Sequence, residues 1–582
     1  MKSLNLVVLL LLVSSLIRAE VMPIADIHGE TSMSPQLDKP VTTEGIVTLV
    51  HANSFWIQSA SDRVPVRREG LQIFTADPAP VGVGDLVRVT GFVDRFRRPD
   101  RERDLFVTRL IQPQGLEVIA SDQTLPPAIP LGAGGLRIPP SLRDEDPTID
   151  RSQSASDAWA WLTGMRVEIT DHVVIGPTNR FGDTWVISPS DHPALNDQGI
   201  LVASQDPDHL DRIQISAHPM LRRDFPQPAH PGDRFRRLEG VVHYAFGGYR
   251  VQASHALDLI AADRAPDALS PRTTLAPGPE HLTIATYNVE NLDPVIERLG
   301  RVEGDDDIDD DIGSGRMARL GAHIAINLSS PDIVALQEIQ DSNGAELGEV
   351  VDADKTFAAL IDAIVDAGGP RYRFIDRPPV RDREGGQPGA NIRNGYLYND
   401  DRVDVIDDSI SRIVHPAFDG SRAPLMAAFE FNGHRIDLIN NHFSSKGGSS
   451  PLFGDGERIV GRAEARRRQA QAVRDALAER EAWSGDAHWV VLGDLNDHWF
   501  SEPLNLLKGF GQERLINLIE LRPIHERWTY IFRGNGQAID HILTTPALAE
   551  QAELKVVHVN ARLAEQAADH EPVLARFQLP PR

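Results

Sequence analysis

Two kinds of hydrophobic pattern meet near residue 280 of the chain. Before that point, short segments alternate apolar and polar residues between glycine and proline punctuation, which is typical of antiparallel β-strands. After it, apolar strand-like runs are interleaved with segments of helical periodicity, for example residues 314–328, 354–367 and 461–481. The pattern predicts an α+β protein, with small all-β domains followed by a mixed sandwich of strands and helices.

The N-terminal half contains a loose internal repeat. Residues 44–93 and 163–242 each begin with a glycine-led strand, continue with an aromatic-bearing strand and a short apolar run, and end with Gly-Asp before an alternating strand. This order resembles OB-fold modules, which are small barrels. We therefore expect two OB-like barrels and two Pro- and Gly-rich linkers: barrels at residues 37–118 and 158–262, and linkers at residues 119–157 and 263–280.

Aromatic and basic residues of the first repeat have two interpretations. OB-folds bind single-stranded nucleic acid by stacking bases on aromatic side chains, so an exposed Phe55 or Trp56 would form such a surface. Basic side chains would then contact phosphate, and the candidates are Arg95, Arg97 and Arg98. Alternatively, Phe55 or Trp56 fills the barrel core and the arginines are solvated.

Strands of the C-terminal half share an unusual property. Each runs through apolar residues and then meets an acid, an amide or a histidine: Asn288 and Glu290, Glu338, Asn440 to His442, Asp494 and Asn496, Asp540 and His541, Asp569 and His570. One polar strand end is an ordinary turn, but buried carboxylates are costly unless they are paired or bind a metal. Six such ends predict a cluster of carboxylates, amides and histidines at one edge of the sandwich.

The composition restricts what this cluster can bind. The 582-residue chain has a formal net charge of −25 and no cysteine. This charge argues against coating nucleic acid through bulk positive charge, although a metal ion supplies positive charge locally at a phosphate site. Without thiolates, the metal ligands are Asp, Glu, Asn and His, which favours Mg²⁺, Mn²⁺ or Ca²⁺.

The first 19 residues are typical of a signal peptide. Lys2 precedes a mostly apolar stretch from Leu4 to Ile17, and Ala19 suits a cleavage site. The apolar stretch is short for a membrane span, and an uncleaved anchor is the alternative. We expect a secreted protein, extracellular or periplasmic, that has no membrane association after cleavage and no obligate protein partner.

Six short motifs carry a resemblance to a known family. In chain order they are TYNVENL, ALQEI, NNHFSSKG, LGDLND, IDHIL and ADHEPV. Together they resemble the endonuclease/exonuclease/phosphatase superfamily, whose DNase I-like fold is a four-layer α/β sandwich, over residues 281–578. The layout is similar to that of secreted bacterial extracellular nucleases with OB-like modules before the catalytic domain.

The resemblance implies roles for the proposed catalytic residues. Asp540 would orient His570, the general base that draws a proton from water, and His442 would be the general acid. Asp494 and Asn496 would contact the scissile phosphate, its nucleophile or a second metal. The family's carboxylate that holds the acid histidine has no counterpart in GANIRNGYLYN, residues 389–399.

The resemblance also implies a metal and a phosphate site. Glu338 would be the main metal carboxylate, with Asn288 and Asp569 beside it. The ion would be Mg²⁺ or Mn²⁺, and Ca²⁺ is the alternative as a structural or co-activating ion. The residues assigned to the substrate phosphate are Arg422, Asn441, Arg393 and Asn391.

We therefore expect a metal-dependent nuclease that hydrolyses DNA, and RNA as a further substrate, with low sequence specificity. Two alternatives stay open: a phosphatase or phospholipid head-group phosphodiesterase of the same fold, and a nucleic-acid-binding or adhesive protein without catalytic activity.

An acidic run at residues 303–313, EGDDDIDDDIG, has two interpretations. It departs from the EF-hand template, since Asp310 stands where glycine is required and Arg316 where the bidentate glutamate belongs. The run is either a solvated loop or part of a loose calcium site.

Overall fold

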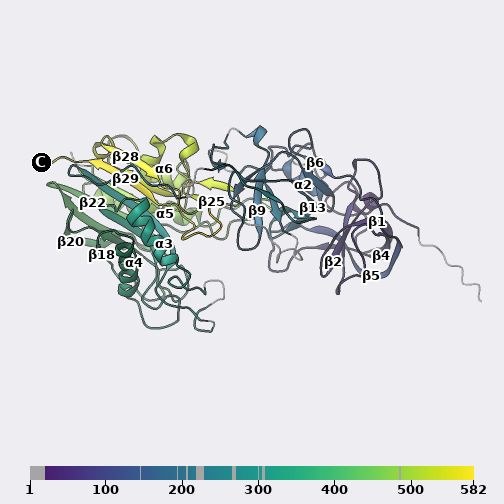
Figure 1. Ribbon diagram of the computed structural model, residues 1–582, viewed down its shortest axis with the longest axis horizontal. Helices are drawn as coiled ribbons and strands as arrows, with labels where there is room; N and C mark the ends of the chain where they lie inside the picture. The colour runs from purple at the N-terminus through teal and green to yellow at the C-terminus, as the bar shows by residue number, and fades with distance from the viewer. Residues whose placement is uncertain are drawn as a thin grey trace, which may run out of the picture.

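The computed structural model describes residues 20–582, except 144–145, 193, 205–207, 218–227, 265–269, 299, 304–307 and 484–486. The expected signal peptide, residues 1–19, lies outside the described residues. The molecule is elongated, with the first β domain at one end, the C-terminal sandwich at the other and the second domain between them (Figure 1). Within the described ranges, no helix combines the length and apolar character needed to cross a membrane.

The first domain is a closed barrel in the order β1-β2-β3-β5-β4. Its elements are α1 (Ile24–His28), β1 (Pro40–Val50), β2 (Ser54–Gln58), β3 (Gly70–Phe74), β4 (Leu86–Phe96) and β5 (Val107–Ala120). Phe55 is fully buried in the barrel core. Trp56 is also buried and packs edge-on against His243 of the second domain, with ring centroids 5.4 Å apart. Neither ring therefore offers a surface for base stacking, and the core interpretation is the one that the structure supports.

The second domain has a seven-stranded sheet where the sequence predicted a small barrel. The sheet order is β6-β7-β13-β14-β11-β9-β8, and the pair β12-β15 stands apart. The segment expected to be a linker supplies β6, which pairs in parallel with β7, because its apolar Ile129 and Leu131 enter the domain core. The elements are β6 (Ile129–Leu131), α2 (Ala155–Leu162), β7 (Arg166–Ile169), β8 (Val173–Gly176), β9 (Asp183–Ile187), β10 (Leu201–Val202), β11 (Ile213–Ser216), β12 (Arg234–Phe235), β13 (Glu239–Ala245), β14 (Gly248–Ala253) and β15 (Leu259–Ile260).

Two six-stranded sheets form the C-terminal domain. The first has the order β18-β19-β17-β16-β29-β28 and the second β20-β21-β22-β23-β27-β24. The first sheet consists of β16 (His281–Leu292), β17 (Ile333–Ile339), β18 (Arg373–Ile375), β19 (Arg393–Tyr398), β28 (Ala552–Val556) and β29 (Val573–Gln578). The second consists of β20 (Asp404–Arg412), β21 (Leu425–Phe431), β22 (His434–His442), β23 (His488–Asp494), β24 (Ile516–Asn517) and β27 (Asp540–Thr544).

Helices cover the outer faces of both sheets, so that the domain has four layers. The helices are α3 (Arg316–Ala322), which continues into the π-helical turn η3 (His323–Asn327), α4 (Asp354–Asp366), α5 (Ala463–Glu479), α6 (Glu502–Lys508) and α7 (Pro546–Ala549). Alternate residues of β17 explain the layering, because Ile333 and Ala335 enter the core between the sheets while Val334 and Leu336 pack with α3 and α4. A third core joins α5 and α6 to the second sheet. This architecture confirms the mixed α/β sandwich predicted for the C-terminal half.

The second domain adds a strand to the C-terminal domain. β10 pairs in parallel with β26 (Asn535–Gln537), which forms a hairpin with β25 (Tyr530–Phe532). Trp528 at the base of this hairpin is fully buried with Ile200 and Val202 of the second domain. The hairpin therefore has its position set by two domains.

Candidate active site

The polar strand ends meet at one edge of the two sheets. β16 and β17 are parallel neighbours in the first sheet, and β22 and β23 are parallel neighbours in the second. β29 and β27 run antiparallel to β16 and β23, so their first residues lie at the edge where the others end. The side chains that this topology brings together are Asn288, Glu338, His442, Asp494, Asp540, Asp569 and His570.

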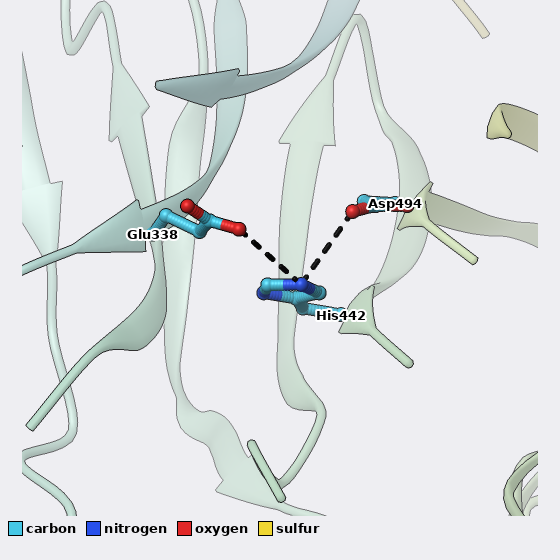
Figure 2. A group of neighbouring side chains, drawn as sticks. All are labelled: Glu338, His442 and Asp494. Carbon is cyan, nitrogen blue, oxygen red and sulfur yellow. Dashed lines mark ion pairs between the residues drawn. The ribbon is translucent and has the colours of Figure 1, made fainter. Parts of the chain in front are cut away.

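Glu338, His442 and Asp494 form the centre of this cluster (Figure 2). The Nε2 atom of His442 lies 3.5 Å from Glu338 Oε1 and 3.5 Å from Asp494 Oδ2. One ligand atom from each of the three residues lies within 4.8 Å of the other two. Two carboxylates from different sheets thus face the same ring nitrogen.

Two side-chain amides and two backbone N–H groups hold these carboxylates in place. The Nδ2 atom of Asn288 donates to Glu338 Oε1 at 3.0 Å and to Asp494 Oδ2 at 3.2 Å, and so bridges the two sheets. Asn496 donates its backbone N–H to Asp494 Oδ1 at 2.8 Å and its Nδ2 to Asp494 Oδ2 at 2.9 Å. The amide of Asn291 reaches Glu338 Oε2 at 3.2 Å. The two carboxylates are therefore pre-oriented by hydrogen bonds.

His570 and Asp540 form a dyad beside this centre. Asp540 Oδ2 lies 2.8 Å from His570 Nδ1, and the Thr529 hydroxyl donates to the same oxygen at 2.6 Å. The opposite nitrogen, His570 Nε2, lies 3.9 Å from Asp494 Oδ2 and 3.7 Å from Asp569 Oδ1. A carboxylate on one ring nitrogen orients the ring and leaves the other nitrogen for proton transfer.

The two imidazoles have opposite charge states. Burial of His442, together with the positive charges of Arg422 and His570, holds its pKa well below the usual value. Burial also opposes the charged form of His570, but the carboxylates of Asp540, Asp569 and Asp494 outweigh it and hold the pKa well above the usual value. These shifts favour a neutral His442 and a charged His570.

Two family models match parts of the chain. Residues 285–570 match the model described as "Endonuclease/Exonuclease/phosphatase family". The C-terminal domain is similar to this family. Residues 118–263 match "Domain of unknown function (DUF8508)". No curated protein matches the chain.

Several solved structures are similar to half of the chain. The humanized D. rerio TDP2 is 18% identical with a TM-score of 0.34, and the match covers 51% of this chain and 99% of that one. An endonuclease/exonuclease/phosphatase from Bacteroides vulgatus is 18% identical with a TM-score of 0.32, covering 51% and 99%. The human nocturnin catalytic domain with bound sulfate is 12% identical with a TM-score of 0.34, covering 52% and 95%.

The donor set at this edge of the C-terminal domain fits a divalent cation such as Mg²⁺ or Mn²⁺. Glu338 and Asp494 offer hard oxygen ligands, and His442 places its Nε2 atom between them. Burial, together with the nearby negative charges of Asp540 and Glu338, raises the pKa of Asp494 to about 7. A bound cation would offset this crowding of charge. Asn288 lies against Glu338, as the sequence suggested, and the structure adds His442 and Asp494 to the cluster around Glu338.

Not every residue assigned to the substrate phosphate faces this centre. Arg422 is buried and donates to the carbonyl of Phe443, directly after His442. Asn441 is fully buried and donates to carbonyls of β22 and β23. Arg393 is buried in an ion pair with Asp376, at 2.9 Å. Asn391 bonds to the carboxylate of Asp341 at 2.8 Å. The contacts of Arg393 and Asn391 hold a loop, so their role at the phosphate stays a prediction.

Three further residues lie at the site and were not predicted from the sequence. Thr529 supports Asp540, and the ring of Tyr530 packs on His570 with centroids 5.0 Å apart. Neither belongs to one of the six motifs. Lys446 lies within NNHFSSKG and its Nζ is 3.9 Å from Asp497 Oδ1, while burial lowers its pKa to about 8. Because Lys446 belongs to one of the six motifs, the sequence could have indicated it as a candidate site residue.

Left-handed backbone is concentrated at this edge. Glu338 and Asn496 have φ values of 63° and 51°, and Glu290 and Asn291 have 52° and 51°. Such non-glycine conformations cost energy and persist where the surrounding structure determines them, which is common at functional sites. Glu338 and Asn496 thus have this strained backbone at the positions where their side chains enter the cluster.

Gly493 allows β22 and β23 to approach each other directly before Asp494. It has a φ of 126°, and a Cβ atom there would lie 2.0 Å from the carbonyl oxygen of Asn441. We expect Gly493→Ala to destabilise the protein by roughly 3 kcal/mol, because the neighbouring atom belongs to the backbone and the two strands must separate. Chemical denaturation measures this change. Gly248→Ala, where a Cβ atom meets nothing within 4 Å, is the matched control; equal stability of the two variants would contradict the close approach.

Proposed function

We propose that this chain is a secreted, metal-dependent phosphodiesterase that hydrolyses DNA, and RNA as a further substrate, with low sequence specificity. The observation that carries the proposal is the placement of the His570–Asp540 dyad next to the Glu338–His442–Asp494 centre. The family match supports a hydrolase of the phosphodiesterase or nuclease type. The proposal of export depends on the sequence of residues 1–19.

Each residue of the centre has a role in this proposal. Glu338, Asp494 and His442 would hold the cation, and Asn288 and Asn496 would keep the two carboxylates in position. When bound, the divalent ion supplies positive charge for the phosphate oxygens in the transition state. Burial holds the pKa of His442 well below the usual value, and a neutral imidazole is a much weaker acid than an imidazolium. We propose His442 as a metal ligand instead of a general acid.

His570 is the proton-transfer group of the proposal. Asp540 occupies Nδ1, which leaves Nε2 to face the centre and to take a proton from the attacking water. Positive charge bound near Asp494 and Asp569 lowers the pKa of His570 toward neutrality, because it offsets the carboxylates that raise it. With a cation held there, His570 would be neutral and able to accept a proton at physiological pH.

Cleavage of a circular plasmid tests the proposed function. The purified protein is incubated with supercoiled plasmid, linear DNA and RNA, each with Mg²⁺, Mn²⁺ or EDTA. We expect nicking of the circle with Mg²⁺ or Mn²⁺ and no cleavage with EDTA, since the carboxylate centre requires a cation. Release of phosphate or of choline phosphate from other esters, without cleavage of nucleic acid, would overturn the proposed substrate.

A further inference from the structure

The segment after β16 contains a second cluster of carboxylates. One oxygen atom each from Asp293, Glu297 and Asp309 lies within 4.8 Å of the other two. The three residues line a cavity of about 220 Å³, together with Glu290, Asn291, Arg316, Gln340 and Gln566. Asp309 belongs to the acidic run for which a calcium site was one interpretation, whereas Asp293 and Glu297 come from a different part of the chain.

Two buried oxygen atoms of residues lining this cavity have no hydrogen-bond partner among the described residues. Asp293 is 1% exposed; its Oδ1 accepts from the amide of Val295 at 2.7 Å, and its Oδ2 has no partner. Gln340 is also 1% exposed, and its Oε1 has no partner. A buried acceptor without a partner costs about 1–3 kcal/mol. Because Gln340 is neutral, its orphaned carbonyl points to a ligand independently of the acidic residues.

Arg316 offsets only part of the negative charge around the cavity. Its guanidinium donates to the side chain of Asp311 and to the carbonyls of Val289, Glu290 and Ala567, and it lies 3.8 Å from Asp309. One guanidinium thus serves several acceptors. Burial of Asp293, with the nearby charges of Asp311, Glu297 and Asp309, raises its pKa to about 8.

We propose that Asp293, Glu297, Asp309 and Gln340 form a calcium site separate from the catalytic centre. The set consists of oxygen ligands alone, three carboxylates and one amide carbonyl, which suits a hard cation and offers no imidazole or thiolate to a transition metal. Ca²⁺ takes six to eight oxygens in irregular geometry and completes its shell with water, whereas Mg²⁺ requires a near-ideal octahedron. The four ligands come from three separate segments of the chain, so an irregular arrangement is expected, and this favours Ca²⁺.

The site joins three segments around Glu338. Glu297 Oε1 accepts from the amide of Ala345 at 2.6 Å, and Asp293 donates its amide to Asp311 Oδ2 at 3.0 Å. Asn291, two residues before Asp293, donates its amide to Glu338. A cation bound here would therefore fix the segment that orients the catalytic carboxylate, and its removal would loosen that segment.

Calcium binding to the full-length protein, without nucleic acid, tests this site. EDTA-treated protein is titrated with Ca²⁺ and, separately, with Mg²⁺ in a calorimeter, and its thermal unfolding is recorded with each ion. We expect Ca²⁺ to bind and to raise Tm, because an ion bound only to the folded state stabilises it. Asp309→Asn, which changes an exposed side chain, is expected to weaken Ca²⁺ binding about tenfold or more, since affinity follows the number of ligand charges.

The controls separate this site from the catalytic centre and from a folding defect. Glu303→Gln removes an exposed charge from the same loop and is expected to bind Ca²⁺ as the wild type does. Glu338→Gln is expected to retain the Ca²⁺-dependent rise in Tm. The proposal is overturned if Asp309→Asn and a folded Asp293→Asn both bind Ca²⁺ with wild-type affinity. It is also overturned if, in Glu338→Gln, Mg²⁺ raises Tm as much as Ca²⁺ at equal concentration.

Discussion

Replacing His570 with alanine is expected to lower the rate of phosphodiester cleavage by about 10²–10⁴-fold, the range that a positioned proton-transfer group contributes. Within the described cluster, His570 is the imidazole with a carboxylate on Nδ1 and a second nitrogen facing Asp494. Initial rates at saturating substrate and metal measure the loss, and far-ultraviolet circular dichroism checks the fold. His525→Ala removes an exposed histidine and is expected to stay within about twofold of the wild type.

The pH profile of Asp540→Asn identifies how His570 acts. The charge of Asp540 is the largest of the contributions that raise the pKa of His570, so its removal lowers that pKa. A general base works above its pKa, and the acidic limb of the rate profile is therefore expected to move to lower pH. Movement of the alkaline limb instead would make His570 the proton donor. An active variant with neither limb displaced would show that the dyad does not carry the proton transfer.

Replacing Glu338 with glutamine is expected to lower the rate by about 10²–10³-fold at a fixed, low metal concentration, because one charged ligand of the cation is lost. Glutamine preserves the shape of the side chain, and its single carbonyl oxygen can still accept from one of the two donors, Asn288 or the amide of Asn291. The loss should therefore concern metal affinity more than structure. Kinetics over a range of Mg²⁺ or Mn²⁺ concentrations, with direct measurement of Mn²⁺ binding, separate the two.

Matched controls make the Glu338→Gln result interpretable. Glu430→Gln changes an exposed glutamate on β21 and is expected to have wild-type metal dependence. Higher metal concentration should restore part of the activity of Glu338→Gln. Wild-type Mn²⁺ affinity in an inactive, folded Glu338→Gln would show that Glu338 acts on the substrate and is not a metal ligand.

Short motifs allowed residues at the centre of the site to be predicted from the sequence. Glu338, Asp494 and His570 each follow or precede an apolar strand within one uninterrupted stretch, so both the strand and its polar end are encoded locally. The supporting residues were not readable, because Thr529 and Tyr530 belong to a hairpin whose position depends on the second domain. The seven-stranded sheet escaped prediction for a similar reason, since β6 comes from a segment whose composition is that of a linker.

The sequence by itself determined the strand and helix pattern of the C-terminal domain, the hard-ligand chemistry and the residue types at the strand ends. Periodicity, composition and motif order are properties of the sequence, so they can be recognised without knowledge of the fold. Only the tertiary structure decided that His442 faces Glu338 and Asp494, that the pKa shifts favour a neutral His442 and a charged His570, and that Gln340 and Asp293 leave oxygen atoms unpaired in one cavity. Each of these depends on burial and on contacts between segments far apart in the chain, which set the distances between charges and the solvent that each charge retains.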